Sequence, residues 1–193
     1  MNFTERLVKN LNTSIAAKQE FLGLAEQHAV FQQAVSAVVT AYRKGGRIYI
    51  AGNGGSAADA QHLAAEFISK LARDRAPLPA EALTVDSSIL TAIGNDYGYD
   101  QLFARQVDGK MRAEDVFLGI TTSGNSVNVI RALERCRAKK VISIVFSGRD
   151  GGKVKSLADY CIIASGKETS TIQELHIVLA HTLCECVEAE ILP

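Results

Sequence analysis

Tryptophan is absent from this 193-residue sequence, and proline is scarce, with only 3 residues. Two of these prolines, Pro77 and Pro79, lie in one short segment that we expect to be a loop. No low-complexity linker and no internal repeat divides the chain. A chain of this length can bury a substantial core, so we expect residues 1–193 to form a single domain.

Long apolar runs and net charge are also missing. No stretch approaches the roughly 20 apolar residues that a membrane-spanning helix needs, so no membrane partner is expected. The 21 basic side chains balance the 21 acidic ones and form no basic block, so no nucleic-acid partner is expected either. Small anions remain candidate ligands, because backbone amides bind them without net charge.

The 4 cysteines form no C-x-x-C pair. The segment from Met1 to Lys9 carries charges and no apolar run, which is not typical of a signal peptide. We therefore interpret the cysteines as reduced thiols of a cytoplasmic protein. A redox or metal-binding role for Cys184 and Cys186, which are separated by one residue, is the alternative.

Short β-branched runs alternate with helical patterns along the chain. Apolar residues at helical spacing predict a helix over residues 3–42. Strands are expected at 47–51, 80–85, 115–120, 141–146 and 160–164, and further helices at 57–71, 127–137 and 171–191. This alternation predicts an α/β protein with a parallel sheet covered by helices on both faces, which is a three-layer sandwich.

Two polar loops follow predicted strands, at the carboxyl ends where open α/β sheets bind ligands. In Gly52–Ser56, glycines let the backbone approach an anion closely. Thr121–Ser126 supplies four hydroxyls beside a helix start, where free N–H groups and the helix dipole favour a phosphate. The alternative for Ser126 is that it only caps its helix. The glycine loop matches neither the Walker pattern nor G-x-G-x-x-G, which argues against a nucleotide.

His62 and Glu66 stand four residues apart on the helix predicted after the glycine loop, so they share one face. Gln173 and His181 lie on the predicted C-terminal helix. Imidazole and carboxylate groups suit either acid–base chemistry or a divalent metal such as zinc. A surface pair without function is the alternative, and His176 is an equal candidate for the functional histidine.

The spacing of Gln173 and His181 constrains any shared metal. Eight residues on a straight helix separate their α-carbons by about 12 Å along the axis. Metal–ligand bonds are only about 2 Å long. If both residues bind one metal, either the helix begins later than predicted or one ligand belongs to another subunit. The spacing therefore indicates a site at a subunit interface.

Several segments are specific in combination: Ala51–His62, Ala65–Glu66, Leu90–Gly98, Thr122–Ser126, Gly148–Gly152 and Ile172–His176, together with His181. In these segments, and over nearly its whole length, the chain resembles the bacterial phosphoheptose isomerases of the sugar-isomerase (SIS) domain superfamily. The resemblance implies a flavodoxin-like SIS fold that assembles into a homotetramer with its sites at subunit interfaces. Residues 1–45 would be a helical oligomerisation segment, and residues 46–193 would be the α/β core.

The resemblance implies an isomerase that converts D-sedoheptulose 7-phosphate to D-glycero-D-manno-heptose 7-phosphate through an enediol. This reaction begins the synthesis of heptose precursors for lipopolysaccharide or capsule. One Zn2+ per subunit is implied, with His62, Glu66, Gln173 and His181 as ligands and with Glu66 and His181 as the catalytic acid–base pair. The implied substrate contacts are Asn53, Gly54, Gly55, Ser56, Glu66, Asn95, Asp96, Thr121, Thr122, Ser123, Ser126 and Gln173.

The main alternative is a non-enzymatic SIS-domain binding module, of the kind that associates with the bacterial replication initiator. That relative lacks the complete His/Glu/Gln/His set together with Gly-Asn-Asp-Tyr-Gly, and both are present in this sequence. A phosphosugar-sensing transcription regulator would append a DNA-binding domain, for which we see no room. Isomerisation of a different phosphosugar stays open, because the shape of the pocket decides it.

Overall fold

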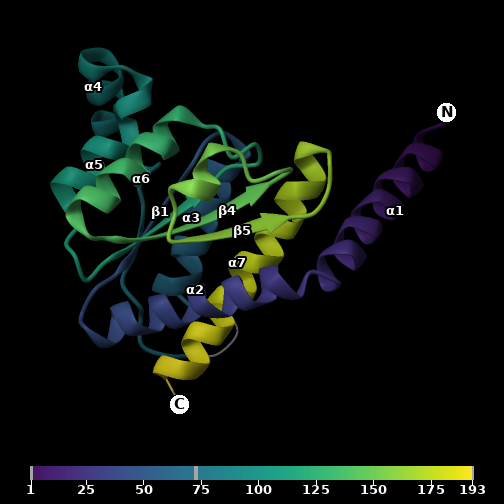
Figure 1. The fold of residues 1–193 in the computed structure, drawn as a ribbon, viewed down its shortest axis with the longest axis horizontal. Coiled ribbons are helices and arrows are strands. Elements are labelled where there is room, and N and C mark those ends of the chain that lie inside the picture. Colours follow the sequence, from purple (N-terminus) through teal and green to yellow (C-terminus); the bar gives the residue numbers. More distant parts are fainter. Residues whose placement is uncertain (1, 72–73, 193) are drawn as a thin grey trace.

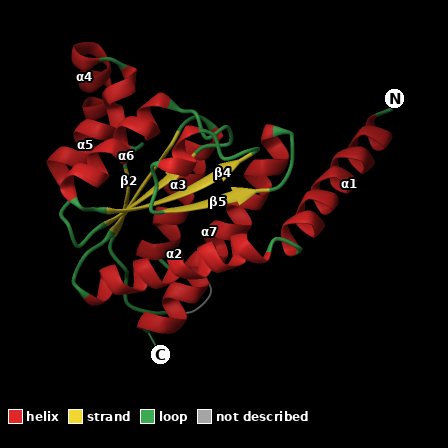
Figure 2. Cartoon of the chain, in the orientation of Figure 1, coloured by secondary structure: helices red, strands yellow, loops and turns green. Residues whose placement is uncertain are grey.

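The computed structural model describes residues 2–71 and 74–192. Within these ranges, five strands form one sheet: β1 (Ile48–Gly52), β2 (Ala80–Ala82), β3 (Val116–Ile120), β4 (Ile142–Gly148) and β5 (Tyr160–Ala164). Their order is β2-β1-β3-β4-β5, and every neighbouring pair is parallel (Figure 2). This is the flavodoxin-like order, in which the strand sequence reverses between β1 and β3. The expected α/β fold is therefore confirmed.

Seven α-helices are described: α1 (Phe3–Leu22), α2 (Ala25–Arg43), α3 (Gly55–Ile68), α4 (Ser87–Tyr97), α5 (Leu102–Lys110), α6 (Val127–Lys139) and α7 (Thr169–Ile191). Two short 3-10 turns are η1 (Tyr99–Gln101) and η2 (Lys153–Ser156). Helices α2, α3 and α7 cover one face of the sheet, and α5 and α6 cover the other (Figure 1). None of the described helices is long and apolar enough to cross a membrane.

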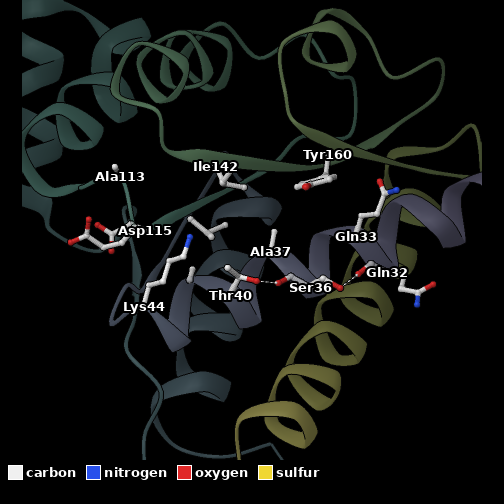
Figure 3. A pocket seen from close by; sticks show the side chains of 13 residues that line it. Gln32, Gln33, Ser36, Ala37, Thr40, Lys44, Ala113, Asp115, Ile142 and Tyr160 are labelled. Atoms are coloured by element: carbon white, nitrogen blue, oxygen red, sulfur yellow. Dashed lines mark hydrogen bonds between the residues drawn. The ribbon is translucent and has the colours of Figure 1, made fainter.

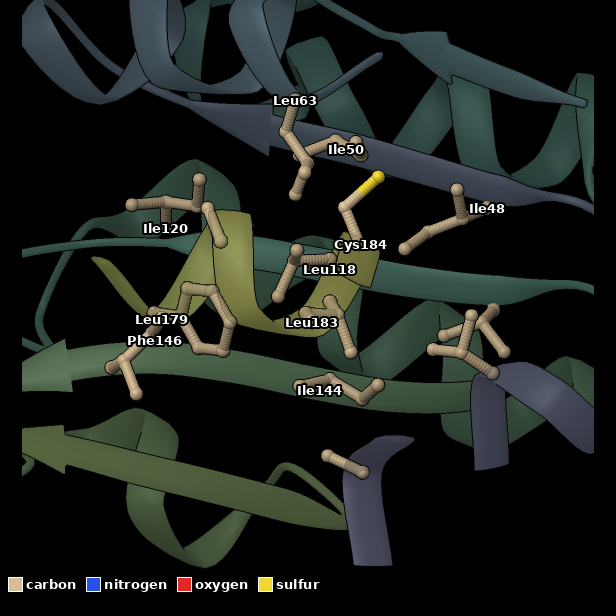
Figure 4. Close-up of a cluster of buried hydrophobic side chains, with 14 of the residues drawn as sticks. Ile48, Ile50, Leu63, Leu118, Ile120, Ile144, Phe146, Leu179, Leu183 and Cys184 are labelled. Atoms are coloured by element: carbon tan, nitrogen blue, oxygen red, sulfur yellow. The ribbon is translucent and has the colours of Figure 1, made fainter. Parts of the chain in front are cut away.

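Alternate side chains of each strand point to opposite faces of the sheet. In β1, Ile50 packs under α2, α3 and α7, whereas Tyr49 packs under the opposite layer. Leu63 of α3 and Leu183 of α7 meet the same face as Ile50 (Figure 4). Burial of one such side chain contributes about 1.5–3 kcal/mol. This packing fixes α3 and α7, which carry the candidate catalytic residues, on one side of the sheet.

The expected helix over residues 3–42 is interrupted. α1 ends at Leu22 and α2 begins at Ala25. Between them, the backbone N–H of Gly23 donates to the carbonyl of Glu20 at 3.1 Å and closes a turn. Glycine is a poor helix former, so the chain changes direction here at little cost. As a result α1 projects away from the body, whereas α2 packs against α7 and β5 (Figure 1).

Sequence reasoning missed α4 and α5, because residues 86–114 show no strong periodicity. A local signal was present, since the Asp86 side chain accepts a hydrogen bond from the N–H of Ile89 at 2.9 Å and caps α4. Other differences are small. α3 and α7 each begin two residues before the predicted start, and β2 ends three residues early.

Candidate functional site

The two polar loops lie next to one another at the carboxyl edge of the sheet. β1 and β3 are neighbours, and their register runs to the pair Gly52–Ile120 at the end of both strands. The glycine loop (Gly52–Ser56) leaves β1 toward α3, and the hydroxyl loop (Thr121–Ser126) leaves β3 toward α6. This point is where the strand order reverses, which is the general ligand site of doubly wound sheets.

The glycine loop turns sharply into α3. Gly54, the N-cap of α3, has φ 55° and ψ −120°, a conformation that favours glycine. No side chain caps this helix. Gly54 and Gly55 are exposed, so a ligand can approach the first-turn amides. Ser56 is only 4% exposed and lies against Gly52, so its role as a substrate contact stays a prediction.

The hydroxyl loop turns its side chains toward one another. The Thr121 and Ser126 hydroxyl oxygens lie 2.9 Å apart in a hydrogen bond. Ser126 occupies the N-cap position of α6 but makes no capping hydrogen bond with its side chain. The alternative that Ser126 only caps its helix is therefore wrong. Thr122 and Ser123 are half-buried beside it, so the loop presents hydroxyls and helix amides together.

The Gly148–Gly152 segment supports the hydroxyl loop. Gly124 has φ 67°, and a Cβ at this position would overlap the Gly151 carbonyl. The N–H of Val154 donates to the Gly124 carbonyl at 3.1 Å, and the N–H of Lys153 donates to Asn125 Oδ1 at 3.2 Å. Glycine is thus needed on both sides of this contact. The contact fixes the backbone of the hydroxyl loop.

Two residues that sequence reasoning missed, Asn128 and Tyr99, join the site. Asn128 is buried in the first turn of α6 and pairs with the side chain of Asn53. The Tyr99 hydroxyl donates to Asn53 Oδ1 at 2.9 Å. Asn95 and Asp96 are exposed in the last turn of α4, shortly before Tyr99, and the Asn95 amide donates to Asp96 Oδ1 at 2.8 Å. Tyr99 therefore ties the segment that carries the Asn-Asp pair to the glycine loop.

His62, Glu66 and His181 come together from α3 and α7. His62 Nε2 lies 2.9 Å from Glu66 Oε1 and 3.4 Å from His181 Nε2. One ligand atom from each residue lies within 4.8 Å of the others. Two nitrogen atoms and one carboxylate oxygen thus converge on one point. Zinc bonds of about 2.0–2.1 Å fit this spacing, and two His with one Glu is a ligand set of catalytic zinc sites.

Gln173 lies on α7, eight residues before His181. Its side-chain amide sits directly against Gly55, where an added Cβ would collide with it. α7 is continuous from Thr169, so the possibility that this helix begins after Gln173 is wrong. Along α7, Gln173 and His181 are separated by about 12 Å. Within one chain, the structure therefore brings together three of the four expected metal ligands.

His176 is a core residue and not part of this cluster. It is 1% exposed, and its Nε2 donates to the Ser147 carbonyl at 2.8 Å. Burial lowers the pKa of His176 to about 4, although the hydrogen bond to Ser147 opposes the shift. The Cys184–Cys186 pair is not assembled either. Both thiols are free, Cys184 is buried, and residues two apart on a helix face different ways.

Two cavities mark the edges of the sheet. One of about 340 Å³ lies between the glycine loop, α4 and α5, with Asn53 and Tyr99 in its wall. A larger one of about 470 Å³ lies at the opposite edge, beside α2 (Figure 3). There Ser36 and Thr40 donate to carbonyls of their own helix, at 3.0 and 2.8 Å. None of the predicted site residues lines the larger cavity, so the size of a cavity does not locate the site.

The fold, with its two polar loops at the switch point, defines a protein of the sugar-isomerase class. The SIS domain matches residues 13–148 of this chain. The chain is 49% identical over 182 residues to the phosphoheptose isomerase of Aneurinibacillus thermoaerophilus, covering 94% of this chain and 92% of that one. The solved phosphoheptose isomerase of Neisseria gonorrhoeae has a TM-score of 0.90 and 42% identity, with 97% and 100% of the two chains covered. That of Francisella tularensis has a TM-score of 0.92 and 32% identity, with 98% and 100% covered. This chain belongs to the phosphoheptose isomerase family and is an isomerase.

Proposed function

We propose that this enzyme interconverts sedoheptulose 7-phosphate and D-glycero-D-manno-heptose 7-phosphate. The observation that carries the proposal is the presence, in one chain, of two polar loops suited to an anion and a His/Glu/His cluster built from α3, the helix that leaves one of them, and from α7. The loops suit a phosphate group, and the cluster suits proton transfer. Relatives of about 49% identity that bear the name of this activity support the same substrate pair.

Ketose–aldose isomerisation moves a proton between C1 and C2 through an enediol. We assign the proton transfers to Glu66 and His181, one taking the proton next to the carbonyl and the other protonating the neighbouring oxygen. His62, at 2.9 Å from the Glu66 carboxylate, orients that group. The amides at the starts of α3 and α6 bind the phosphate, with the hydroxyls of Thr121–Ser126 as further donors.

His62, Glu66 and His181 would hold the metal, which we propose is one zinc ion per subunit. When bound, zinc stabilises the negative charge that develops on the substrate oxygen. Within its own chain, Gln173 lies against Gly55, where it would contact the substrate. It would join the metal ligands only across a subunit boundary, because of its separation from His181 along α7.

We further propose that the chain, as one domain, assembles into a homotetramer through its first 45 residues and closes its sites at the interfaces. Phe3, Leu7, Leu11 and Ile15 repeat every four residues on α1 and are 96, 59, 53 and 52% exposed. A contiguous exposed apolar face of this kind is typical of a protein–protein interface. α1 projects from the body, which leaves this face free for a second copy of the chain (Figure 1).

The proposal places the enzyme in the cytoplasm. All 4 cysteines are free thiols, the state that a reducing compartment maintains.

The decisive experiment follows sedoheptulose 7-phosphate by NMR with the purified protein, before and after chelation and zinc restoration. We expect conversion to heptose 7-phosphate that falls with chelator and returns with zinc. If the chelator does not change the conversion, the isomerase activity stands, and Glu66 and His181 act as an acid–base pair without a metal. A folded protein that converts nothing would contradict the proposed reaction and favour a phosphosugar-binding module.

A further inference from the structure

The His62/Glu66/His181 cluster is assembled from two helices, so its geometry depends on how α3 sits on α7. His62 and Glu66 belong to α3, and His181 belongs to α7. Glu66 lies only two residues before the last residue of α3, Ile68. Helix ends fray, because their last carbonyl groups have no partner within the helix. An interaction from outside α3 must therefore fix its carboxyl end against α7.

α3 lacks two of the usual devices that end a helix, although the N–H of Leu78 donates to the Phe67 carbonyl at 3.0 Å. Its C-cap residue, Ser69, has φ −87° and ψ −93°, which is not the left-handed glycine cap, and its last turn contains no basic residue. The Arg75 guanidinium takes their place. Its Nη2 donates to the Glu66 carbonyl at 2.7 Å, and its Nη1 donates to the carbonyls of Phe67 and Ser69 at 2.7 and 3.3 Å. Its positive charge also faces the negative end of the helix dipole.

The same guanidinium is bonded to α7 through Glu188. Arg75 Nε donates to Glu188 Oε1 at 2.8 Å, and Nη2 donates to the same oxygen. The two side chains are only 6% and 7% exposed. The Cys184 thiol, one turn earlier on α7, adds a hydrogen bond to Glu188 Oε1 at 3.6 Å. Glu188 follows His181 by seven residues, which places both on one side of α7.

We propose that the Arg75–Glu188 pair positions the His62/Glu66/His181 cluster by locking the end of α3 to α7. The proposal rests on the metal-assisted function proposed above. A buried ion pair adds little net stability, because the loss of hydration offsets the attraction. Its role here is geometric, because one planar guanidinium fork bonds both the backbone of Glu66 on α3 and the Glu188 carboxylate on α7, the helix that carries His181. Lysine has the same charge but no such fork.

Arg75→Lys is the principal test variant, because it keeps the charge and removes the fork. The matched control is Lys110→Gln, which breaks the half-buried Lys110–Glu81 pair, at 2.5 Å, between α5 and β2. Cobalt(II) is titrated into the metal-free proteins, and both its affinity and its visible absorption band are recorded. We expect Arg75→Lys to lower cobalt affinity by about 10- to 100-fold and to alter the band, as loss of groups that orient metal ligands does. The control should keep both.

Hydrogen exchange supplies a readout that needs no metal. In metal-free Arg75→Lys, the amides of residues 67–69 should exchange faster while those of β1 and β3 do not. Unchanged cobalt affinity and band in folded Arg75→Lys overturn the positioning role, even if its melting temperature falls. If that variant does not fold, the double variant Arg75→Met/Glu188→Met, which leaves no unpaired charge, is judged by the same criteria. Wild-type protein that binds no cobalt contradicts the metal function itself, and the positioning proposal with it.

Discussion

The side-chain amides of Asn53 and Asn128 form a reciprocal pair. Asn53 Nδ2 donates to Asn128 Oδ1 at 2.9 Å, and Asn128 Nδ2 donates to Asn53 Oδ1 at 2.8 Å. Asn53 belongs to the loop after β1, and Asn128 belongs to the first turn of α6. The pair therefore bridges the switch point and holds the starts of α3 and α6 at a fixed separation.

We predict that Asn128→Asp weakens phosphosugar binding. The carboxylate keeps the acceptor but loses the donor to Asn53, and it places a negative charge beside the amides that we propose bind the phosphate. A helix start tolerates that charge, so the fold should persist. We expect KM to rise about tenfold, or about 1.4 kcal/mol, with a smaller change in kcat. Steady-state kinetics with sedoheptulose 7-phosphate measures both constants.

The matched control is Asn12→Asp, which adds the same charge on exposed α1. It should leave KM unchanged. Equal values of KM in the wild type and in Asn128→Asp would show that the amide pair does not determine the affinity of the proposed phosphate site.

The sheet and its ligand edge were predictable from sequence because they depend on local patterns. Buried β-branched runs followed by Gly52–Ser56 and Thr121–Ser126 indicate strand, loop and helix in order. β5 was predicted at its observed bounds, and β1, β3 and β4 within two residues of theirs. The helical break at Gly23 and the helices α4 and α5 were missed. Their signals are single capping and turn residues and not periodic patterns.

From residue spacing alone, the side-chain cluster was predictable only where its residues share one helix. The spacing of His62 and Glu66 indicates a common face, but no spacing places His181 beside them, and only the family resemblance implies that grouping. Asn128 and Arg75 are polar residues without a motif, and their partners lie 75 and 113 positions away. Only the packing of α3, α6 and α7 on the sheet reveals these contacts. Gln173 shows the converse, since the family pattern groups it with His181 and the continuous α7 separates them.

Glu66→Gln should abolish most of the activity without unfolding the protein. The amide has the shape of the carboxylate, but it neither accepts a proton nor binds a metal ion well. Loss of a general acid–base group lowers kcat by about 10²- to 10⁴-fold. Glu185→Gln, an exposed glutamate on the same helix as His181, is the control and should keep wild-type turnover. Near-normal turnover of Glu66→Gln would exclude Glu66 from the proton transfers.

Leu7→Glu should weaken assembly of the enzyme. Leu7 lies in the middle of the exposed apolar face of α1, and a buried interface does not accept an unpaired charge. Sedimentation velocity should show smaller species, and activity should fall if, as proposed, the sites close between subunits. Lys9→Glu places a glutamate about 200° around the same helix and should remain assembled. Identical sedimentation of Leu7→Glu and wild type would contradict the role of this face.

His176 makes the stability of the fold depend on pH. Burial lowers the pKa of this imidazole from 6.5 to about 4, and its Nδ1 has no hydrogen-bond partner within the described residues. Between these two values the unfolded chain binds a proton that the folded protein excludes. Stability is therefore fully present above pH 6.5 and is lost as the pH falls toward 4. A shift of this size corresponds to about 3 kcal/mol.

His176→Gln should remove this dependence, because its amide can still donate to the Ser147 carbonyl but does not titrate. Urea unfolding of the metal-free proteins between pH 7 and 4 measures the difference. The wild type should lose about 3 kcal/mol more than the variant as the pH falls. His28→Gln, which removes an imidazole from the surface of α2, should follow the wild-type curve. Parallel curves for the wild type and His176→Gln would mean that the buried imidazole is protonated without cost, and that water or a rearranged side chain satisfies its Nδ1 in the folded state.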